Sequence, residues 1–255
     1  MQNNTFSGLF IGRNLITLKE VDSTNTFLKN ALSKSTPLFD GTVIMADSQL
    51  AGRGQSGNSW ISEAGKNLTF SILLNPNFLA IDRQFDLNMA ISLAMNDFLN
   101  KYTAGGAFIK WPNDCYIGNK KIGGILIENI VHGNTIKHAI IGIGLNVNQE
   151  KFPGGLKNVT SLKQALHQDY NLVHLLGEIC SIIEARYLQL KAGNTDKLRD
   201  EYLSQLYLKD EWALFRFDKQ IQSGKIRGIT AIGQLILETT EGLRYFNNKE
   251  IEFIN

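Results

Sequence analysis

Two long apolar runs near the middle of the chain, at 122–131 and 136–147, flank the short segment His132-Gly133-Asn134. Apolar runs bounded by a short turn with glycine are typical of neighbouring strands joined as a hairpin. Shorter apolar or β-branched runs lie at 15–18, 42–46, 68–74 and 108–111. The sequence therefore predicts a mixed β-sheet, and its helical patterns predict helices packed on that sheet.

The spacing of apolar residues predicts where these helices lie. The strongest pattern covers 86–102, a second follows the N-cap residues at 22–25, and three more cover about 161–207. Residues 47–66 and 148–160 are polar and rich in glycine, which is typical of loops. Beyond residue 210 the pattern changes to short strands at 211–217, 225–230, 234–238 and 243–246. The expected fold is α+β, with a small β module at the C-terminus.

The charge and the cysteine content exclude several classes of protein. The 255 residues carry 26 basic and 24 acidic side chains, too even a balance for bulk electrostatic binding of nucleic acid. Cys115 and Cys180 lie far apart, so neither a disulfide framework nor a thiolate zinc site is expected, and a reducing cytoplasm is the default. No apolar run approaches the ~18 residues of a membrane span, and no secretory leader is recognisable.

A glycine-rich loop at 49–60 contains the run Gly52-Arg53-Gly54-Gln55-Ser56-Gly57. The run matches the GxGxxG pattern of dinucleotide sites, but no helical pattern follows it and no acid stands about 20 residues further on. Backbone N–H groups that glycine leaves uncovered, together with one guanidinium, suit an anion such as phosphate. A mobile surface loop with an incidental arginine is the alternative interpretation.

A second candidate segment runs from Lys110 to Glu128. Lys110-Trp111-Pro112-Asn113-Asp114 ends one strand, and Lys121 begins the next, followed by Gly123 and Gly124. A glycine pair within a strand allows a ligand or another backbone to approach closely. Lys121 is therefore a candidate cation at the edge of a cleft, whereas the alternative is an ordinary solvated lysine in a turn.

A third segment, at 140–148, is a buried strand interrupted by Gly142 and Gly144. The missing side chains leave room for a flat ligand against the sheet. The alternative is a strand thinned by glycine for close packing. Asn146 in the same run needs a hydrogen-bond partner, because a buried amide without one is unfavourable.

Taken in order, these segments resemble the biotin–protein ligases. The motifs are DSTN at 22–25, GRGQ followed by a tryptophan at 52–60, KWPND at 110–114, KIGGILIE at 121–128 and GIGLNVN at 142–148. Each motif alone is weak, but five in register over about 130 residues are specific. The resemblance implies a catalytic domain at 1–208, of the class II synthetase or biotin–lipoate ligase type, and an SH3-like β-barrel at 209–255.

The resemblance also implies a reaction in two steps. ATP adenylates the carboxylate of biotin to give biotinyl-5'-AMP and diphosphate, and a lysine of a carrier protein then attacks the acyl-adenylate. The implied cofactor is Mg²⁺, which accompanies ATP and is not held by a protein cage. The implied partner is the biotin carboxyl carrier domain of acetyl-CoA carboxylase, and the ligase itself is expected to be a monomer or homodimer, without a membrane partner.

The motifs carry the family's site residues onto this chain. Lys121 is implied to be the main catalytic cation, with Arg53 and Asp114 as further catalytic residues. Residues implied to contact biotin are Ser23, Thr24, Asn25, Gln49, Gly52, Arg53, Gly54, Gln55, Trp60, Lys121, Gly123 and Gly124. Residues implied to contact the nucleotide are Arg53, Lys110, Asn113, Asn146, Gly142 and Gly144.

Two departures from the family pattern are visible. Many members have arginine where this chain has Gln55, which removes a charge that helps to retain the adenylate. Phe152 is the one aromatic residue in loop 148–160, where members often place an aromatic for the adenine. Only 21 residues precede Asp22, too few for the DNA-binding domain that some members carry, so no binding to DNA is expected.

Two other functions remain as alternatives to a biotin ligase. A lipoate or octanoate ligase would share the fold, although the KWPND and GRG segments favour biotin. A non-catalytic regulator would keep the pocket without turnover, but the presence of both Lys121 and Arg53 argues against it.

Overall fold

The predicted central hairpin is present in the computed structural model, which describes residues 8–34, 38–154, 156 and 158–254. β6 (Lys120–His132) and β7 (Thr135–Leu145) pair antiparallel inside a seven-stranded sheet with the order β1-β2-β3-β7-β6-β5-β4. Only the β1–β2 pair is parallel, so the sheet is mixed, as expected. The other strands are β1 (Leu15–Val21), β2 (Val43–Gln49), β3 (Leu68–Leu74), β4 (Ala107–Lys110) and β5 (Asp114–Ile117).

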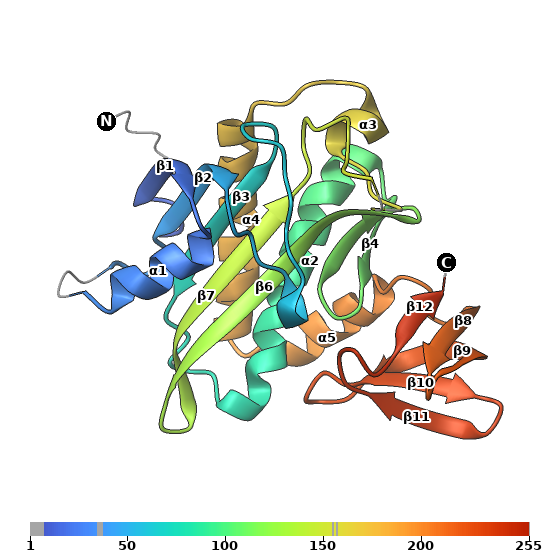
Figure 1. Ribbon diagram of the computed structural model, residues 1–255. Coiled ribbons are helices and arrows are strands. Elements are labelled where there is room, and N and C mark those ends of the chain that lie inside the picture. The colour runs from blue at the N-terminus through green and yellow to red at the C-terminus, as the bar shows by residue number, and fades with distance from the viewer. Residues whose placement is uncertain (1–7, 35–37, 155, 157, 255) are drawn as a thin grey trace.

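Helices cover both faces of this sheet (Figure 1). α1 (Thr24–Leu32) packs Leu28 against Ile44, Leu73 and Ile140 on one face. The neighbouring positions of the same strands point the other way, into the main core beneath α2 (Gln84–Thr103) and α4 (Leu172–Lys191), because successive side chains of a strand alternate between faces. α5 (Thr195–Ser204) and the short α3 (Leu162–Leu166) complete the helices. None of the helices described has the length and apolar character needed to cross a bilayer.

The C-terminal segment forms a second, five-stranded antiparallel sheet with the order β11-β10-β9-β8-β12. Its strands are β8 (Trp212–Phe217), β9 (Gln220–Ile229), β10 (Leu235–Thr239), β11 (Gly242–Phe246) and β12 (Glu252–Ile254). The alternating pattern of burial in β10, with Leu235 and Leu237 fully buried, is that of a sheet with one face on a core. Trp111 donates its indole N–H to the carbonyl of Gly233 at 2.9 Å, which ties the second sheet to the first unit.

The sequence did not predict β5, β12 or the first half of β9. β5 and β12 have four and three residues, too few for an alternating pattern to stand out, and pairing with a neighbour defines them. The predicted loop at 47–66 contains the end of β2 and a 3-10 turn, η1 (Gln55–Gly57). The predicted helix at 86–102 is confirmed, within two residues at each end. Residues 155 and 157 of the predicted loop 148–160 lie outside the described residues.

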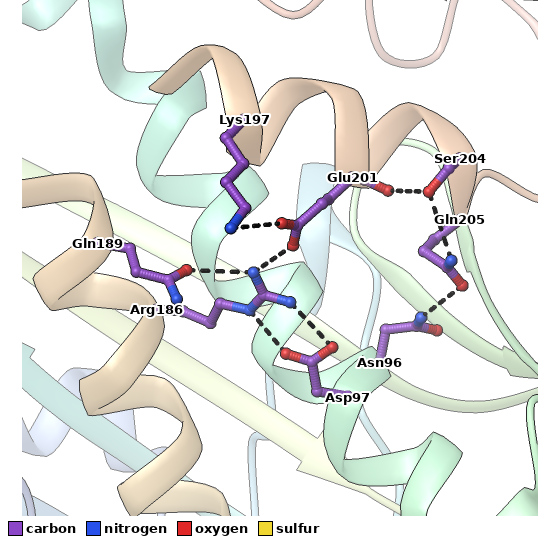
Figure 2. Close-up of polar contacts among 8 residues, drawn as sticks. All are labelled: Asn96, Asp97, Arg186, Gln189, Lys197, Glu201, Ser204 and Gln205. Carbon is purple, nitrogen blue, oxygen red and sulfur yellow. Dashed lines mark hydrogen bonds and ion pairs between the residues drawn. The ribbon is translucent and has the colours of Figure 1, made fainter. Parts of the chain in front are cut away.

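A charged network joins the three longest helices behind the sheet (Figure 2). Arg186 of α4 donates to both carboxylate oxygens of Asp97 on α2, at 2.7 and 3.1 Å, and also to Glu201 on α5. Close by, Asn96 donates to the side-chain oxygen of Gln205 at 3.0 Å, and the backbone carbonyl of Gln205 accepts from the backbone N–H of Ile109 at 2.9 Å. The network therefore fixes β4, and with it the start of the KWPND segment.

Replacing Arg186 by alanine is expected to lower the free energy of unfolding by about 2 kcal/mol. The substitution leaves two carboxylates partly buried without their guanidinium, and a two-pronged pair in this setting contributes more than a surface ion pair. Lys197→Ala is the matched control, because Lys197 reaches the same Glu201 at 3.9 Å from a largely exposed position and should change stability by less than about 1 kcal/mol. Urea denaturation of the two variants measures the difference, and equal losses would contradict the prediction.

Candidate active site

A cleft of about 720 Å³ opens between the first sheet, the loop at 53–60 and the C-terminal sheet. Its floor comes from β6 and β7, and one wall comes from the segment after β4. Its volume falls in the range of small-molecule sites, about 300–1,000 Å³. The C-terminal module contributes part of the rim, through Asn248, Lys249, Ile251, Glu252 and Phe253.

Most of the predicted site residues line this single cleft. Arg53 and Lys121, which lie 68 positions apart in the chain, both face it. The others are Ser23, Thr24, Asn25, Gln49, Gly54, Gln55, Trp60, Lys110, Asn113, Asp114, Gly124, Gly142 and Gly144.

Lys121 and Asp114 form an ion pair at the cleft, with Lys121 Nζ 2.6 Å from Asp114 Oδ1. The β5–β6 pairing brings the two residues together, and Gly124 leaves them room, since a Cβ there would lie 3.3 Å from the Asp114 oxygen. Backbone hydrogen bonds from Lys121 to Asn158 and from Thr160 to Lys121 fix the start of the strand. About a third of each of the two side chains is exposed, so both can meet a ligand.

Lys110 supplies a second amine to the cleft. Its Nζ lies 3.1 Å from the hydroxyl of Tyr116 and 4.8 Å from the centre of the Phe253 ring. Burial lowers the pKa of this amine, and the charge of Lys121 lowers it further, while Asp114 and Glu252 act in the opposite direction. An amine that is partly desolvated in this way interacts strongly with an incoming anion.

Hydrogen bonds from side chains of α2 and α5 hold the turn between β4 and β5 in place. The carbonyl of Pro112 accepts from Asn88 at 2.8 Å and from the hydroxyl of Tyr202 at 2.9 Å. Asn113 is buried and donates its amide to the carbonyl of Ile125. These contacts show that Pro112 and Asn113 of the KWPND motif shape the turn that presents Asp114.

A buried hydrogen-bond network forms the opposite end of the cleft. Ser71 Oγ lies 2.6 Å from both Thr24 Oγ1 and Asn25 Oδ1, and Gln49 Oε1 accepts from the N–H of Thr24 at 2.8 Å. Ser23, one of the N-cap residues expected at 22–25, stands at the N-cap of α1, but its side chain makes no capping hydrogen bond. Ser71 was not identified from the sequence, since one serine in an apolar strand gives no functional signal.

Arg53 meets a partner that the sequence did not assign. Its guanidinium donates to both oxygens of Glu128, at 3.2 and 2.6 Å, and Asn25 Nδ2 donates to the same carboxylate at 2.8 Å. The loop around Arg53 is a narrow hairpin, closed by hydrogen bonds from Gly54 to Asn58 and from Trp60 to Gly52. The sequence gives one clue to this pairing, which is that Glu128 is the last residue of the KIGGILIE motif.

The room expected over the glycines of β7 is taken by the protein's own side chains. A Cβ on Gly142 would lie 2.4 Å from Asn25 Oδ1, and one on Gly144 would lie 2.3 Å from the Trp60 ring. The expectation of space for a flat ligand against these glycines is therefore corrected. The glycines instead let the Asn25 amide and the Trp60 indole lie directly against the sheet.

Three residues that were predicted to contact a ligand do not line the cleft. Gly52 faces the carbonyl of Trp60, and Gly123 faces the carbonyl of Gly144 across the β6–β7 pair. Asn146 donates its amide to the carbonyl of Thr160 at 3.0 Å, which gives the buried amide the partner it needs. Phe152 is also absent from the lining, where the aromatic side chains are Trp60, Phe70, Trp111 and Phe253.

Within the part of the chain that the structure describes, no three His, Cys, Asp or Glu side chains gather to hold a metal ion. The carboxylates that line the cleft there are Asp114 and Glu252. Mg²⁺ prefers one or two carboxylates together with phosphate oxygens, so this donor set suits an ion that arrives with a nucleotide.

The comparisons with known proteins agree with this geometry. Residues 17–146 match the model of the biotin/lipoate A/B protein ligase family. The bifunctional ligase/repressor BirA of Bacillus spizizenii is 30% identical over 252 residues, which cover 95% of this chain and 74% of BirA. The biotin–[acetyl-CoA-carboxylase] ligase of Paracoccus denitrificans is 26% identical, and the match covers 92% of this chain and 99% of the relative. The structure of a biotin protein ligase from Aquifex aeolicus in complex with biotin and ATP has a TM-score of 0.79 at 29% identity, covering 95% of this chain and 99% of the other.

Proposed function

Because the chain belongs to the biotin/lipoate A/B protein ligase family, we propose that its cleft binds biotin and ATP and joins them. The chain is an ATP-dependent biotin protein ligase, which forms biotinyl-5'-AMP and transfers the biotinyl group to a lysine of a carrier protein. One observation supports this most directly: Lys121, Lys110 and Arg53 line one cleft, and Thr24 of the buried polar network lines it too.

The first step requires two anions to meet. The biotin carboxylate attacks the α-phosphorus of ATP, an O–P bond forms, and diphosphate leaves with the electron pair of the broken P–O bond. We assign Lys121 to the carboxylate and the α-phosphate, and Arg53 and Lys110 to the phosphates, because cations held in place lower the repulsion between the partners. Mg²⁺ would neutralise phosphate charge, beside Asp114 and Glu252.

The second step needs a neutral amine. The carrier lysine attacks the acyl carbon of the adenylate, a C–N bond forms, AMP leaves with the electron pair of the broken C–O bond, and the amine releases its proton to solvent. We assign Asp114 to the approach of this lysine, since its carboxylate lines the cleft and carries the negative charge that an arriving ammonium group meets. The network of Ser71, Thr24 and Asn25, with Gln49, is assigned to the ureido end of biotin.

The partner is a biotin carboxyl carrier protein, which the name of the Paracoccus relative supports through acetyl-CoA carboxylase. We further propose a catalytic domain at 1–208 and a separate domain at 209–255, for which the two separate sheets are the support. A cytoplasmic location, the absence of DNA binding, and a monomer or homodimer stay predictions.

Transfer of labelled biotin to a carrier domain tests the function. With ATP and Mg²⁺, label is expected on the carrier, and diphosphate release is expected to depend on biotin. An excess of unlabelled lipoate or octanoate is the control, and it should not reduce the labelling. Labelling with lipoate in place of biotin would favour the lipoate ligase, and binding of biotin without diphosphate release would favour a regulator without turnover.

A further inference from the structure

The guanidinium that the proposed chemistry assigns to phosphate is already paired with a carboxylate. Arg53 Nη2 lies 2.6 Å from Glu128 Oε2, and its second nitrogen reaches Oε1 at 3.2 Å. A two-pronged pair of this kind fixes the direction as well as the distance of the guanidinium. Glu128 therefore competes for the group that a phosphate would use.

The same carboxylate also connects the loop to the buried end of the cleft. Glu128 Oε2 accepts from Asn25 Nδ2 at 2.8 Å, and Asn25 Oδ1 in turn accepts from Ser71 at 2.6 Å. Asn25 is buried, so its amide orientation depends on these partners. Glu128 thus lies between the group assigned to phosphate and the groups assigned to the ureido ring.

The strength of the pair suits a contact that a substrate displaces. The side chains of Arg53 and Glu128 are 41% and 24% exposed, so water screens their attraction. A triphosphate carries several negative charges and can outcompete one screened carboxylate. In Figure 1 the loop with η1 lies against β6, which is the position that this pair maintains.

We propose that Glu128 is a positioning residue, which holds Arg53 in the closed loop before substrate binds and releases the guanidinium to the phosphates of ATP. The inference rests on the proposed function, because it takes the incoming anion to be ATP. It assigns to Glu128 two effects of opposite sign: the carboxylate closes the empty loop, and it weakens the binding of nucleotide.

Glu128→Gln separates these two effects. The amide oxygen still accepts from Asn25, but the charge that holds Arg53 is lost. Trypsin cuts after basic residues, and Arg53 is the only basic residue at 50–60, so the appearance of the fragment 1–53 measures release of this side chain directly. In the variant without ligand, this cleavage is expected to be roughly threefold to tenfold faster, and ATP in the presence of biotin is expected to bind tighter by a similar factor.

Glu252→Gln is the matched control. Glu252 lines the cleft on the side of the C-terminal module, and its ion-pair partner is Arg216 rather than Arg53, so the variant removes the same charge without touching the loop. Its cleavage after Arg53 should equal that of the wild type. Faster cleavage in this control would overturn the proposal, because loop opening would then follow from cleft charge in general.

Two further results would overturn the proposal. One is an unchanged rate of cleavage in Glu128→Gln, and the other is faster cleavage together with weaker binding of ATP, which is the pattern of a purely structural residue. Glu128→Asp, which keeps the charge on a shorter side chain, should cleave at an intermediate rate. A wild-type protein that releases no diphosphate with biotin would refute the proposed function, while the cleavage measurement without ligand would still decide whether Glu128 holds the loop.

Discussion

Lys121→Ala is expected to slow biotin-dependent diphosphate release by at least ~10²-fold, the size of effect seen when one main charge-stabilising group is removed. The amine lies 2.6 Å from Asp114 on the cleft surface. Without it, the biotin carboxylate and the α-phosphate approach each other with less of their repulsion cancelled. A rate assay with saturating biotin and ATP, in a single turnover, measures the chemical step separately from product release.

Lys120→Ala provides the control for Lys121→Ala. Lys120 is the neighbouring residue of β6, but it is exposed and lies on the other side, against a surface groove with Glu150 and Lys163. The Lys120→Ala variant removes the same charge from the same strand, and its rate of diphosphate release should stay within about twofold of that of the wild type. A Lys121→Ala variant that keeps more than a tenth of the wild-type rate would show that Lys121 is not the main catalytic cation. Lys121 and Asp114 are partly exposed, so the free energy of unfolding of Lys121→Ala should differ from that of the wild type by less than about 1 kcal/mol.

Glu184→Ala is expected to produce the largest loss of stability, about 3 kcal/mol. The carboxylate, only 5% exposed on α4, accepts from the backbone N–H groups of Leu9, Phe10 and Ile11 at 2.5, 2.7 and 2.8 Å. Alanine leaves these donors without a partner, and a buried donor without an acceptor is unfavourable by about 1–3 kcal/mol. The segment before β1 would then detach from the core, where Ile11 is fully buried.

Urea denaturation followed by tryptophan fluorescence checks this prediction, with Glu178→Ala as the control. Glu178 lies on the same helix, but its partners are the side chains of Lys101, His174 and Tyr102 rather than backbone N–H groups, so the loss of stability should be smaller, about 1 kcal/mol. Glu184→Gln keeps one accepting oxygen, and its loss of stability should fall between those of Glu184→Ala and Glu178→Ala. A Glu184→Ala variant as stable as the control would show that these backbone groups find water or other partners.

The main elements of the fold were predictable because their signals are local. The helix at 86–102 follows from the spacing of its apolar residues, and the strands at 122–131 and 136–147 follow from apolar runs on either side of a short turn; the structure confirms all three. β5 and β12 were not predicted, since strands this short exist only through the strands they pair with. The glycines of β7 were recognised as sites of close approach, but the sequence could not tell that Asn25 and Trp60 fill the space.

The sequence by itself determined the α+β class, the motif residues and the presence of cationic groups at 53, 110 and 121, because residue type and spacing are properties of the chain. Tertiary structure alone decided which of these groups meet: Arg53 with Glu128, Thr24 and Asn25 with Ser71, and Lys110 with Phe253 of the C-terminal module. The physical reason is that such contacts join residues from strands and loops distant in sequence. Sheet order and register bring them within hydrogen-bonding distance, and no periodicity along the chain records that order.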